Sequence, residues 1–249
     1  MSRFGVAVCD WDGRTKDLAE AVSKTMTERV YLCVEDRHVL YRQDNVHEAI
    51  QDFIDMGLEV ILDPWGVAGR FAGETTSHHK HMFHHWLQFA ETTKATSIML
   101  DEPLNIKDDL AFAIHQCRTF APSKFVHLAV EPYKLQHLDD YLEGQKIDEL
   151  SVSTYLFGKQ ISEATIDSIV KFATEMDKIV PERAAFWIQT WDIPAGQEWI
   201  PELLISLFTL RRPGAMMNIW AWDAFRTVSS KRPDNPDLVW AKILNKINS

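Results

Sequence analysis

The feature that most constrains the fold is a regular alternation of short apolar runs with longer segments of helical periodicity. One run and the helical segment after it recur about every thirty residues along the 249-residue chain. Strands that alternate with helices in this way form a parallel sheet, and eight such units close into a barrel. We therefore predict an α/β protein that is one (β/α)8 barrel, with residues 1–249 as a single domain.

The predicted strands are apolar runs that end in polar or acidic residues. They are Gly5–Cys9, Val30–Val34, Leu58–Leu62, Ser97–Glu102, Phe125–Val130, Leu150–Tyr155, Ala185–Trp191 and Ala215–Trp222. The predicted helices are Lys16–Glu28, Asn45–Met56, Ser77–Thr93, Asp108–Phe120, Leu135–Leu142, Glu163–Ile179, Trp199–Leu210 and Asp237–Ile247. An open doubly wound sheet is the alternative, but it would need a glycine-rich phosphate-binding turn after the first strand. Residues 10–13, Asp-Trp-Asp-Gly, do not form such a turn.

Composition and charge exclude several classes of protein. The formal net charge is −10, and the sequence has no basic cluster beyond Arg211-Arg212, which argues against nucleic acid as a partner. No apolar run approaches the roughly 18 residues of a membrane span, and no signal peptide is visible, so we expect a cytoplasmic protein without membrane attachment. The three cysteines stand in apolar runs and suggest reduced core thiols. The oligomeric state stays open.

Acidic side chains recur at the ends of the predicted strands, which is where barrel enzymes carry their active sites. Three consecutive strands end in a carboxylate followed by proline, at Asp63, Glu102 and Glu131. Exposed strand ends favour acids in any protein, so part of this pattern needs no function. Asp101 adjoins Glu102, and successive strand residues point to opposite faces, so both acids can serve only if the strand ends there. We predict that Asp63, Asp101, Glu102 and Glu131 are catalytic.

Tryptophans gather near the same strand ends. Aromatic faces beside carboxylates suit a sugar, because C–H faces stack on indole rings and hydroxyls bond to acids and amides. Tryptophans 11, 65, 191, 220 and 222 lie at such positions. The predicted substrate-binding residues are Asp10, Trp65, Arg70, Tyr155, Gln189, Trp191, Trp220, Trp222 and Asp223. Arg70 lies in a long glycine-containing loop and is equally well explained as an ordinary surface residue paired with Glu74.

The tripeptide Asp101-Glu102-Pro103 resembles the fourth-strand motifs of two sets of barrel glycoside hydrolases. One is the retaining group with Asn-Glu-Pro, whose Glu is the acid/base; here Asp101 replaces the Asn, and the seventh strand lacks that group's Glu nucleophile. The other is the hexosaminidase-like set with an Asp-Glu pair, in which the Glu is the general acid and the Asp orients the substrate's 2-acetamido group. The resemblance implies that Glu102 is the general acid of a glycosidase acting on a small-molecule or oligosaccharide substrate.

Two other functions remain open. Asp63, Glu102 and Glu131 could hold one Mg²⁺ in a lyase or isomerase, since oxygen ligands suit this ion. A non-catalytic carbohydrate-binding barrel would keep the tryptophans without needing a buried acid. Histidines 78, 79, 81, 84 and 85 form a cluster, but acids or thiols at ligand spacing are missing. We therefore expect no resident metal and no cofactor.

Overall fold

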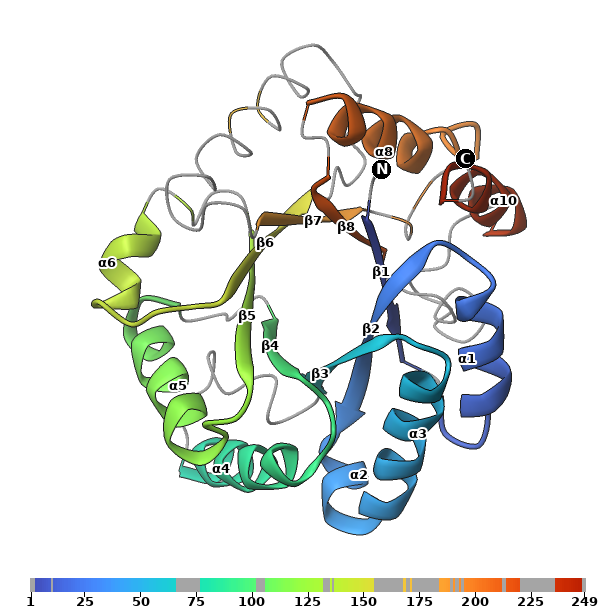
Figure 1. Ribbon diagram of the computed structural model, residues 1–249. Helices are drawn as coiled ribbons and strands as arrows, with labels where there is room; N and C mark the ends of the chain where they lie inside the picture. The colour runs from blue at the N-terminus through green and yellow to red at the C-terminus, as the bar shows by residue number, and fades with distance from the viewer. Residues whose placement is uncertain are drawn as a thin grey trace.

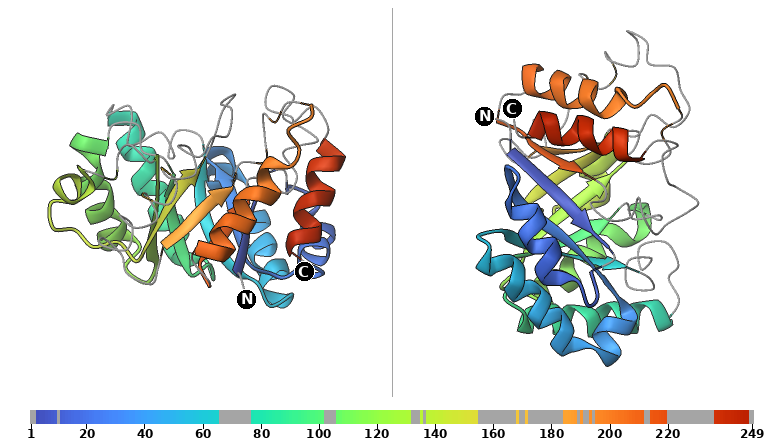
Figure 2. Two further views of the ribbon diagram at one scale, coloured as in Figure 1. Left: turned by 90° about the horizontal axis from the view of Figure 1, so that it is seen from above. Right: turned by 90° about the vertical axis from the view of Figure 1, so that its right-hand side faces the viewer.

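The structure, a computed structural model, is a closed barrel of eight parallel strands in sequence order, with helices around it (Figure 1). It describes residues 3–9, 11–65, 77–101, 106–131, 135, 137–154, 168, 171, 184–188, 190, 193, 195–211, 214–219 and 236–247. The ring closes where β1 pairs with β8, Gly5 lying opposite Asn218. Figure 2 shows from two sides that the helices flank the strands, with α8 and α10 next to each other. The predicted (β/α)8 fold is confirmed.

The strands are β1 (Arg3–Val8), β2 (Thr27–Glu35), β3 (Glu59–Trp65), β4 (Ser97–Asp101), β5 (Phe125–Val130), β6 (Glu149–Thr154), β7 (Ala184–Ile188) and β8 (Met216–Ile219). The helices are α1 (Thr15–Ser23), α2 (Asp36–Tyr41), α3 (Gln43–Asp55), α4 (Ser77–Thr92), α5 (Ile106–Phe120), α6 (Leu138–Leu142), α8 (Ile200–Arg211) and α10 (Pro236–Ile247). The predicted helix Glu163–Ile179 falls almost entirely outside the described residues.

Two predicted elements differ from the structure. The first helix was expected to reach Glu28, but α1 ends at Ser23 because β2 already begins at Thr27, which pairs with Phe4 of β1. No helix was predicted between the strand Val30–Val34 and the helix Asn45–Met56, whereas the structure has the short helix α2 there. This helix is stabilised by a capping box in which Glu35 and His38 each bond to the other's backbone. The reciprocal cap was overlooked because His takes the place of the usual Glu or Gln.

The main core lies between the strands and the surrounding helices. Residues of one parity on each strand point outward towards the apolar faces of the helices. Leu32 and Leu62 belong to this core together with Ile50 and Phe53 of α3. A second and much smaller cluster fills the barrel itself. It consists of Ala7, Tyr31, Ile61, Met99, Ala129 and Trp187. These residues have the other parity, so alternation along each strand divides the molecule into an outer core and a barrel interior.

The barrel interior is filled by large side chains that require small neighbours. The rings of Tyr31 and Trp187 meet at 4.7 Å between centroids, and the Trp187 indole donates to Ser151 Oγ at 3.0 Å. Gly5 lies beside them, and a Cβ there would come within 2.6 Å of Asn218 Oδ1 and 3.0 Å of the Tyr31 ring. These contacts also place Asn218 inside the barrel, a direction that alternation alone left open. Glycine at position 5 is needed for this close approach.

The amino ends of the strands are closed by a buried ionic network. Arg29 Nη1 donates to both carboxylate oxygens of Glu149 at 2.7 and 2.8 Å, and Arg29 Nε lies 3.2 Å from Glu59 Oε2. His127 Nδ1 lies 3.4 Å from Glu149 Oε1, and the Tyr31 hydroxyl donates to the same oxygen at 3.4 Å. Arg29, His127 and Glu149 are each less than a tenth exposed. A buried ion-paired network at this end of a barrel serves stability.

Removing one member of this network should be costly. We expect Glu149→Gln to lower the free energy of unfolding by about 3 kcal/mol, because it leaves the buried Arg29 charge with Glu59 as its remaining acidic partner. Urea denaturation measures this loss. The control is Glu28→Gln, which breaks the exposed Arg3–Glu28 pair and should cost less than about 1 kcal/mol. Equal losses in the two variants would contradict the structural role of the network.

His127 should make stability depend on pH. Burial lowers the pKa of His127, and the nearby Glu149 only partly opposes this. Unfolded chains take up this proton near pH 6.5, so between that pH and the lower folded value the unfolded state binds more protons. The contribution of His127 to stability should therefore fall as the pH drops from about 7 to 5, by at most roughly 1.4 kcal/mol per pH unit. In the same urea series, His127→Gln should gain stability relative to wild type as the pH drops; a difference between the two proteins that does not change with pH would show that His127 is not responsible.

Candidate functional site

The carboxyl ends of the strands bring acids and thiols together at the mouth of the barrel. The register of β2 against β3 places Cys33 opposite Asp63. This pair lies two residues beyond the Tyr31–Ile61 pair, whose side chains fill the barrel. Asp101 is the last residue of β4 and has the parity of Met99, which also lies inside. The same alternation that packs the barrel therefore points Cys33, Asp63 and Asp101 into its mouth.

Asp63 is the most perturbed acid of this mouth. Its side chain is completely buried, its Oδ2 accepts a hydrogen bond from the Cys33 thiol at 3.5 Å, and its Oδ1 has no hydrogen-bond partner among the described residues. Burial raises the pKa of Asp63 well above its usual value, the negative charge of Asp101 raises it further, and the Cys33 hydrogen bond opposes both. A buried carboxyl beside a second carboxylate holds a proton where ordinary acids have lost it.

Two thiols lie beside this acid. Cys9 follows β1 directly, and its Sγ lies 2.9 Å from Cys33 Sγ. Cys9 is half-buried and also packs against the apolar cluster inside the barrel, while Cys33 is buried. The sequence suggested core thiols but did not place them at the site. The alternation of the strands carried the signal for this placement. Each cysteine follows by two residues a side chain that faces the barrel interior, Cys9 after Ala7 and Cys33 after Tyr31.

Other acids stand at the edge of the mouth. Glu131 directly follows β5, Glu35 ends β2, and both are half-buried, as Asp101 is. Of the four predicted catalytic residues, the structure therefore describes Asp63, Asp101 and Glu131 and places each at the carboxyl end of its strand. It brings Asp63 and Asp101 into electrostatic contact. Glu102 lies outside the described residues.

Most of the predicted substrate-binding residues also lie outside the described residues. They are Asp10, Arg70, Tyr155, Gln189, Trp191, Trp220, Trp222 and Asp223. Trp65 is the last residue of β3, and its side chain is not described. The structure therefore leaves the proposed aromatic wall as a prediction.

Trp11 does not belong to the sugar-facing aromatics suggested by the sequence. It is 1% exposed, its indole donates to the Cys33 carbonyl at 2.7 Å, and its ring packs at 4.7 Å against that of His38. Its place in the outer core explains the difference, since Trp11 holds the loop after β1 against β2. A tryptophan near a strand end can serve packing as readily as binding.

The histidine-rich helix shows no metal centre in its described part. The ring of His84 in α4 packs against that of Phe120 in α5, with the centroids 3.7 Å apart and the planes tilted by 32°, and His81 is exposed. More generally, the described residues contain no group of three or more His, Cys, Asp or Glu side chains placed to hold a metal ion. Among the described helices, none is both long and apolar enough to cross a membrane.

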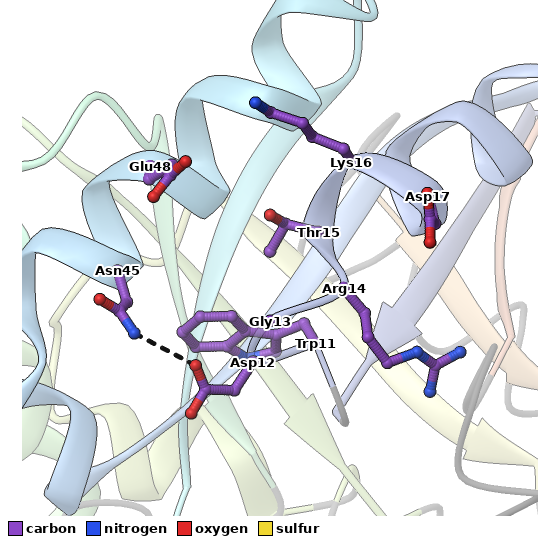
Figure 3. A pocket seen from close by; sticks show the side chains of 9 residues that line it. All are labelled: Trp11, Asp12, Gly13, Arg14, Thr15, Lys16, Asp17, Asn45 and Glu48. Carbon is purple, nitrogen blue, oxygen red and sulfur yellow. Dashed lines mark hydrogen bonds between the residues drawn. The ribbon is translucent and has the colours of Figure 1, made fainter.

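A pocket of about 290 Å³ lies outside the barrel, where the loop after β1 and the start of α1 face α3 (Figure 3). Three of its polar side chains, Asp12, Thr15 and Asn45, bond to one another or to neighbours. Asn45 donates to Asp12 at 3.2 Å, Arg42 pairs with the same acid, and the Thr15 hydroxyl donates to Asp52 at 2.6 Å. Acids and bases are mixed along its wall, so its charge does not select a ligand. The buried acid Asp63 does not line this pocket.

Comparison with solved structures shows which proteins share this fold. The endo-beta-1,4-glucanase Xac0029 from Xanthomonas axonopodis pv. citri superposes with a TM-score of 0.68 at 11% identity, over 99% of this chain and 100% of that one. A GH5 family lichenase from Caldicellulosiruptor sp. F32 gives 0.65 at 13% identity, over 96% and 84%. D-Psicose 3-epimerase from Clostridium cellulolyticum H10, solved with D-tagatose, gives 0.59 at 9% identity, over 99% and 96%. At these identities the likeness establishes the barrel fold alone.

No protein-family model matches the chain, and no curated protein sequence matches it significantly. The class of protein that the fold defines is therefore the (β/α)8 barrel, shared with glycoside hydrolases and sugar epimerases.

Asp63 should lower the stability of the fold at neutral pH. The folded state favours its protonated form, so the contribution of Asp63 to stability falls as the pH rises from about 4 towards the raised folded pKa. We expect Asp63→Asn, which cannot ionise, to be more stable than wild type at pH 7 by more than about 1 kcal/mol, with a difference that shrinks towards pH 4. Urea denaturation across this range measures the effect, with Asp139→Asn on the exposed face of α6 as a matched control. A variant less stable than wild type at pH 7 would contradict the raised pKa of the buried Asp63 carboxyl group.

Proposed function

We propose that this protein is a glycoside hydrolase-like enzyme that cleaves a glycosidic bond at the carboxyl end of its barrel, with Glu102 as the general acid. The observation that carries the proposal is the acid pair Asp63–Asp101, in which burial and the neighbouring charge raise the pKa of Asp63. Glycosidic cleavage needs a carboxyl that keeps its proton and a second carboxylate that meets positive charge developing on the sugar. The mouth of this barrel supplies the electrostatic conditions for both.

The sequence after β4 favours a role for two adjacent acids. We propose that the strand does not continue past Glu102, because Pro103 cannot extend the ladder, so that Asp101 and Glu102 need not point to opposite faces of the sheet. We propose that Glu102 protonates the leaving oxygen. Asp101 then faces the sugar as an anion, either stabilising the oxocarbenium-like centre or orienting a 2-acetamido group. Asp63 and Glu131 supply further carboxylates, and the separation between Glu102 and its partner decides between retention and inversion.

The proposed substrate-binding residues extend the inward alternation of the strands. Trp65, Gln189 and Trp220 come two residues after positions 63, 187 and 218, whose side chains face the barrel interior. Tyr155 and Trp191 continue the same two-residue spacing at the ends of the sixth and seventh predicted strands. We propose that these aromatic residues stack on the sugar and that Asp10, Arg70, Trp222 and Asp223 contribute further contacts. Glucan-cleaving enzymes with this fold indicate which substrates to test first.

A metal-dependent isomerase is the second candidate, because the fold is shared with D-psicose 3-epimerase and because Asp63, Glu102 and Glu131 carry oxygen ligands suited to Mg²⁺. A non-catalytic sugar-binding barrel is the third. Treatment with EDTA separates the first two: a hydrolase of the proposed kind keeps its activity, whereas the isomerase loses ketose epimerisation and regains it with Mg²⁺ or Mn²⁺.

The decisive variant is Glu102→Gln, which keeps the shape of the side chain and removes its titratable proton. We expect hydrolysis to fall by about 10²-fold or more, because general acid catalysis typically contributes that much, with sugar binding retained. The assays are turnover of β-1,4-glucan and of aryl glycosides with and without a 2-acetamido group, and calorimetric binding of the preferred sugar.

The control for this experiment is Glu20→Gln, an exposed residue of α1 that pairs with Lys24 and should leave turnover unchanged. If Glu102→Gln turns over substrate like wild type, Glu102 is not the acid. If neither protein hydrolyses any glycoside but both bind sugar equally well, the barrel is a binding module. Loss of wild-type activity to EDTA would instead support the isomerase.

A further inference from the structure

Cys9 and Cys33 stand side by side on neighbouring strands. The register of β1 against β2 pairs Val8 with Leu32, so the residues that follow, Cys9 and Cys33, are at the same level. Their sulfur atoms lie 2.9 Å apart, and both side chains have the inward parity of Ala7 and Tyr31. The third cysteine, Cys117, is fully buried in α5, far along the chain from this pair.

This arrangement meets the requirements of a disulfide. Neighbouring strands lie about 4.7–4.9 Å apart, within the range of Cα separations that disulfides span. An S–S bond is about 2.05 Å long, so closure requires the two sulfur atoms to approach by about 0.9 Å. Side-chain rotation can supply a shift of this size without moving the strands.

We propose that Cys9 and Cys33 form an oxidisable dithiol at the mouth of the barrel, which closes reversibly to a disulfide on reaction with a peroxide. Cys9 is the half-buried member of the pair and is therefore the thiol that a small oxidant from solvent reaches first. Cys33 is buried behind it, in hydrogen-bond contact with Asp63. This inference is independent of the reaction that the mouth catalyses.

The chemistry balances with hydrogen peroxide as the oxidant. The Cys9 thiolate attacks one peroxide oxygen, the O–O bond breaks, and the products are a sulfenic acid on Cys9 and hydroxide. The hydroxide released in this step takes the proton of the Cys33 thiol, and the Cys33 thiolate attacks the Cys9 sulfur, which lies 2.9 Å away. The S–O bond breaks and hydroxide leaves as water once protonated. In sum, two thiols and one peroxide become one disulfide and two waters.

Closure would alter the acid at the floor of the mouth. In the reduced protein, the Cys33 thiol donates to Asp63 and opposes the effect of burial on the pKa of that carboxyl. A disulfide sulfur has no hydrogen to donate. Oxidation therefore removes the hydrogen bond to Asp63 Oδ2 and moves the pKa of Asp63 further upward, which couples the redox state of the pair to the protonation of the acid.

The test uses the whole native protein and hydrogen peroxide as the probe. Treated protein is alkylated, digested with trypsin and analysed by mass spectrometry, while intact mass is measured with and without dithiothreitol. We expect intact protein lighter by two hydrogens, a cross-link between peptides 4–14 and 30–37, and full reversal by dithiothreitol. Cys9→Ser and Cys33→Ser should each abolish the cross-link.

Cys117→Ser is the matched control. Burial raises the pKa of Cys117 to about 12, so its thiol stays protonated and unreactive, and the variant should form the cross-link at the wild-type rate. Wild-type protein that keeps all its thiols, or that accumulates oxygen adducts on Cys9 without the cross-link, would overturn the proposal. The wild-type result decides this even if one serine variant fails to fold.

A second measurement tests the coupling to Asp63. Carbon-13 NMR follows the carboxyl signal that disappears in Asp63→Asn, in the reduced and the cross-linked protein. The titration midpoint of this signal should be higher after oxidation. A midpoint that does not move, in protein shown to carry the disulfide, would limit the pair to a modification site without effect on the acid.

Discussion

Side-chain alternation on a closed ring of parallel strands is the constraint on which the rest of this structure depends. Closure gives every strand one face towards the helices and one towards the barrel axis, and the two faces differ in chemistry. Leu32 and Leu62 pack outward, whereas Cys33 and Asp63, one residue further along, point inward and contact each other on neighbouring strands. A slip of one residue between β2 and β3 would exchange these faces and move a buried acid into the apolar core.

The two ends of the barrel treat buried charge in opposite ways. At the amino end, the charge of Arg29 lies close to two carboxylates, and its Nη1 donates hydrogen bonds to both oxygens of Glu149. At the carboxyl end, Asp63 lies buried beside another acid, with one oxygen unpaired among the described residues. The first arrangement contributes to stability, and the second opposes it. Natural proteins tolerate such local instability at functional sites, so the contrast supports the proposal that the mouth is the functional end.

The sequence predicted the fold well because its signals were local and repeated. Each apolar run had the length of a strand, and the closed order of strands β1 to β8 followed from the alternation with helices. Single elements were less predictable where two local signals competed. The end of α1 was misplaced because Thr27 and Glu28 continue a helical pattern in the sequence. In the structure, both residues belong to β2, which pairs with β1. Trp11 was misjudged because an indole near a strand end looks alike in sequence whether it stacks on a sugar or bonds to the Cys33 carbonyl.

By itself, the sequence determined the number and order of the strand–helix units and the placement of acids at the strand ends, since both follow from the order of residues along the chain. Only the tertiary structure decided which of those side chains meet. Cys9 and Cys33, whose sulfur atoms lie 2.9 Å apart, are 24 positions apart in the sequence. Asp63 and Asp101, whose charges interact, are 38 positions apart. Their distances and burial depend on strand register and on the closure of the ring. A pKa depends on burial and neighbouring charge, and neither exists until the chain has folded.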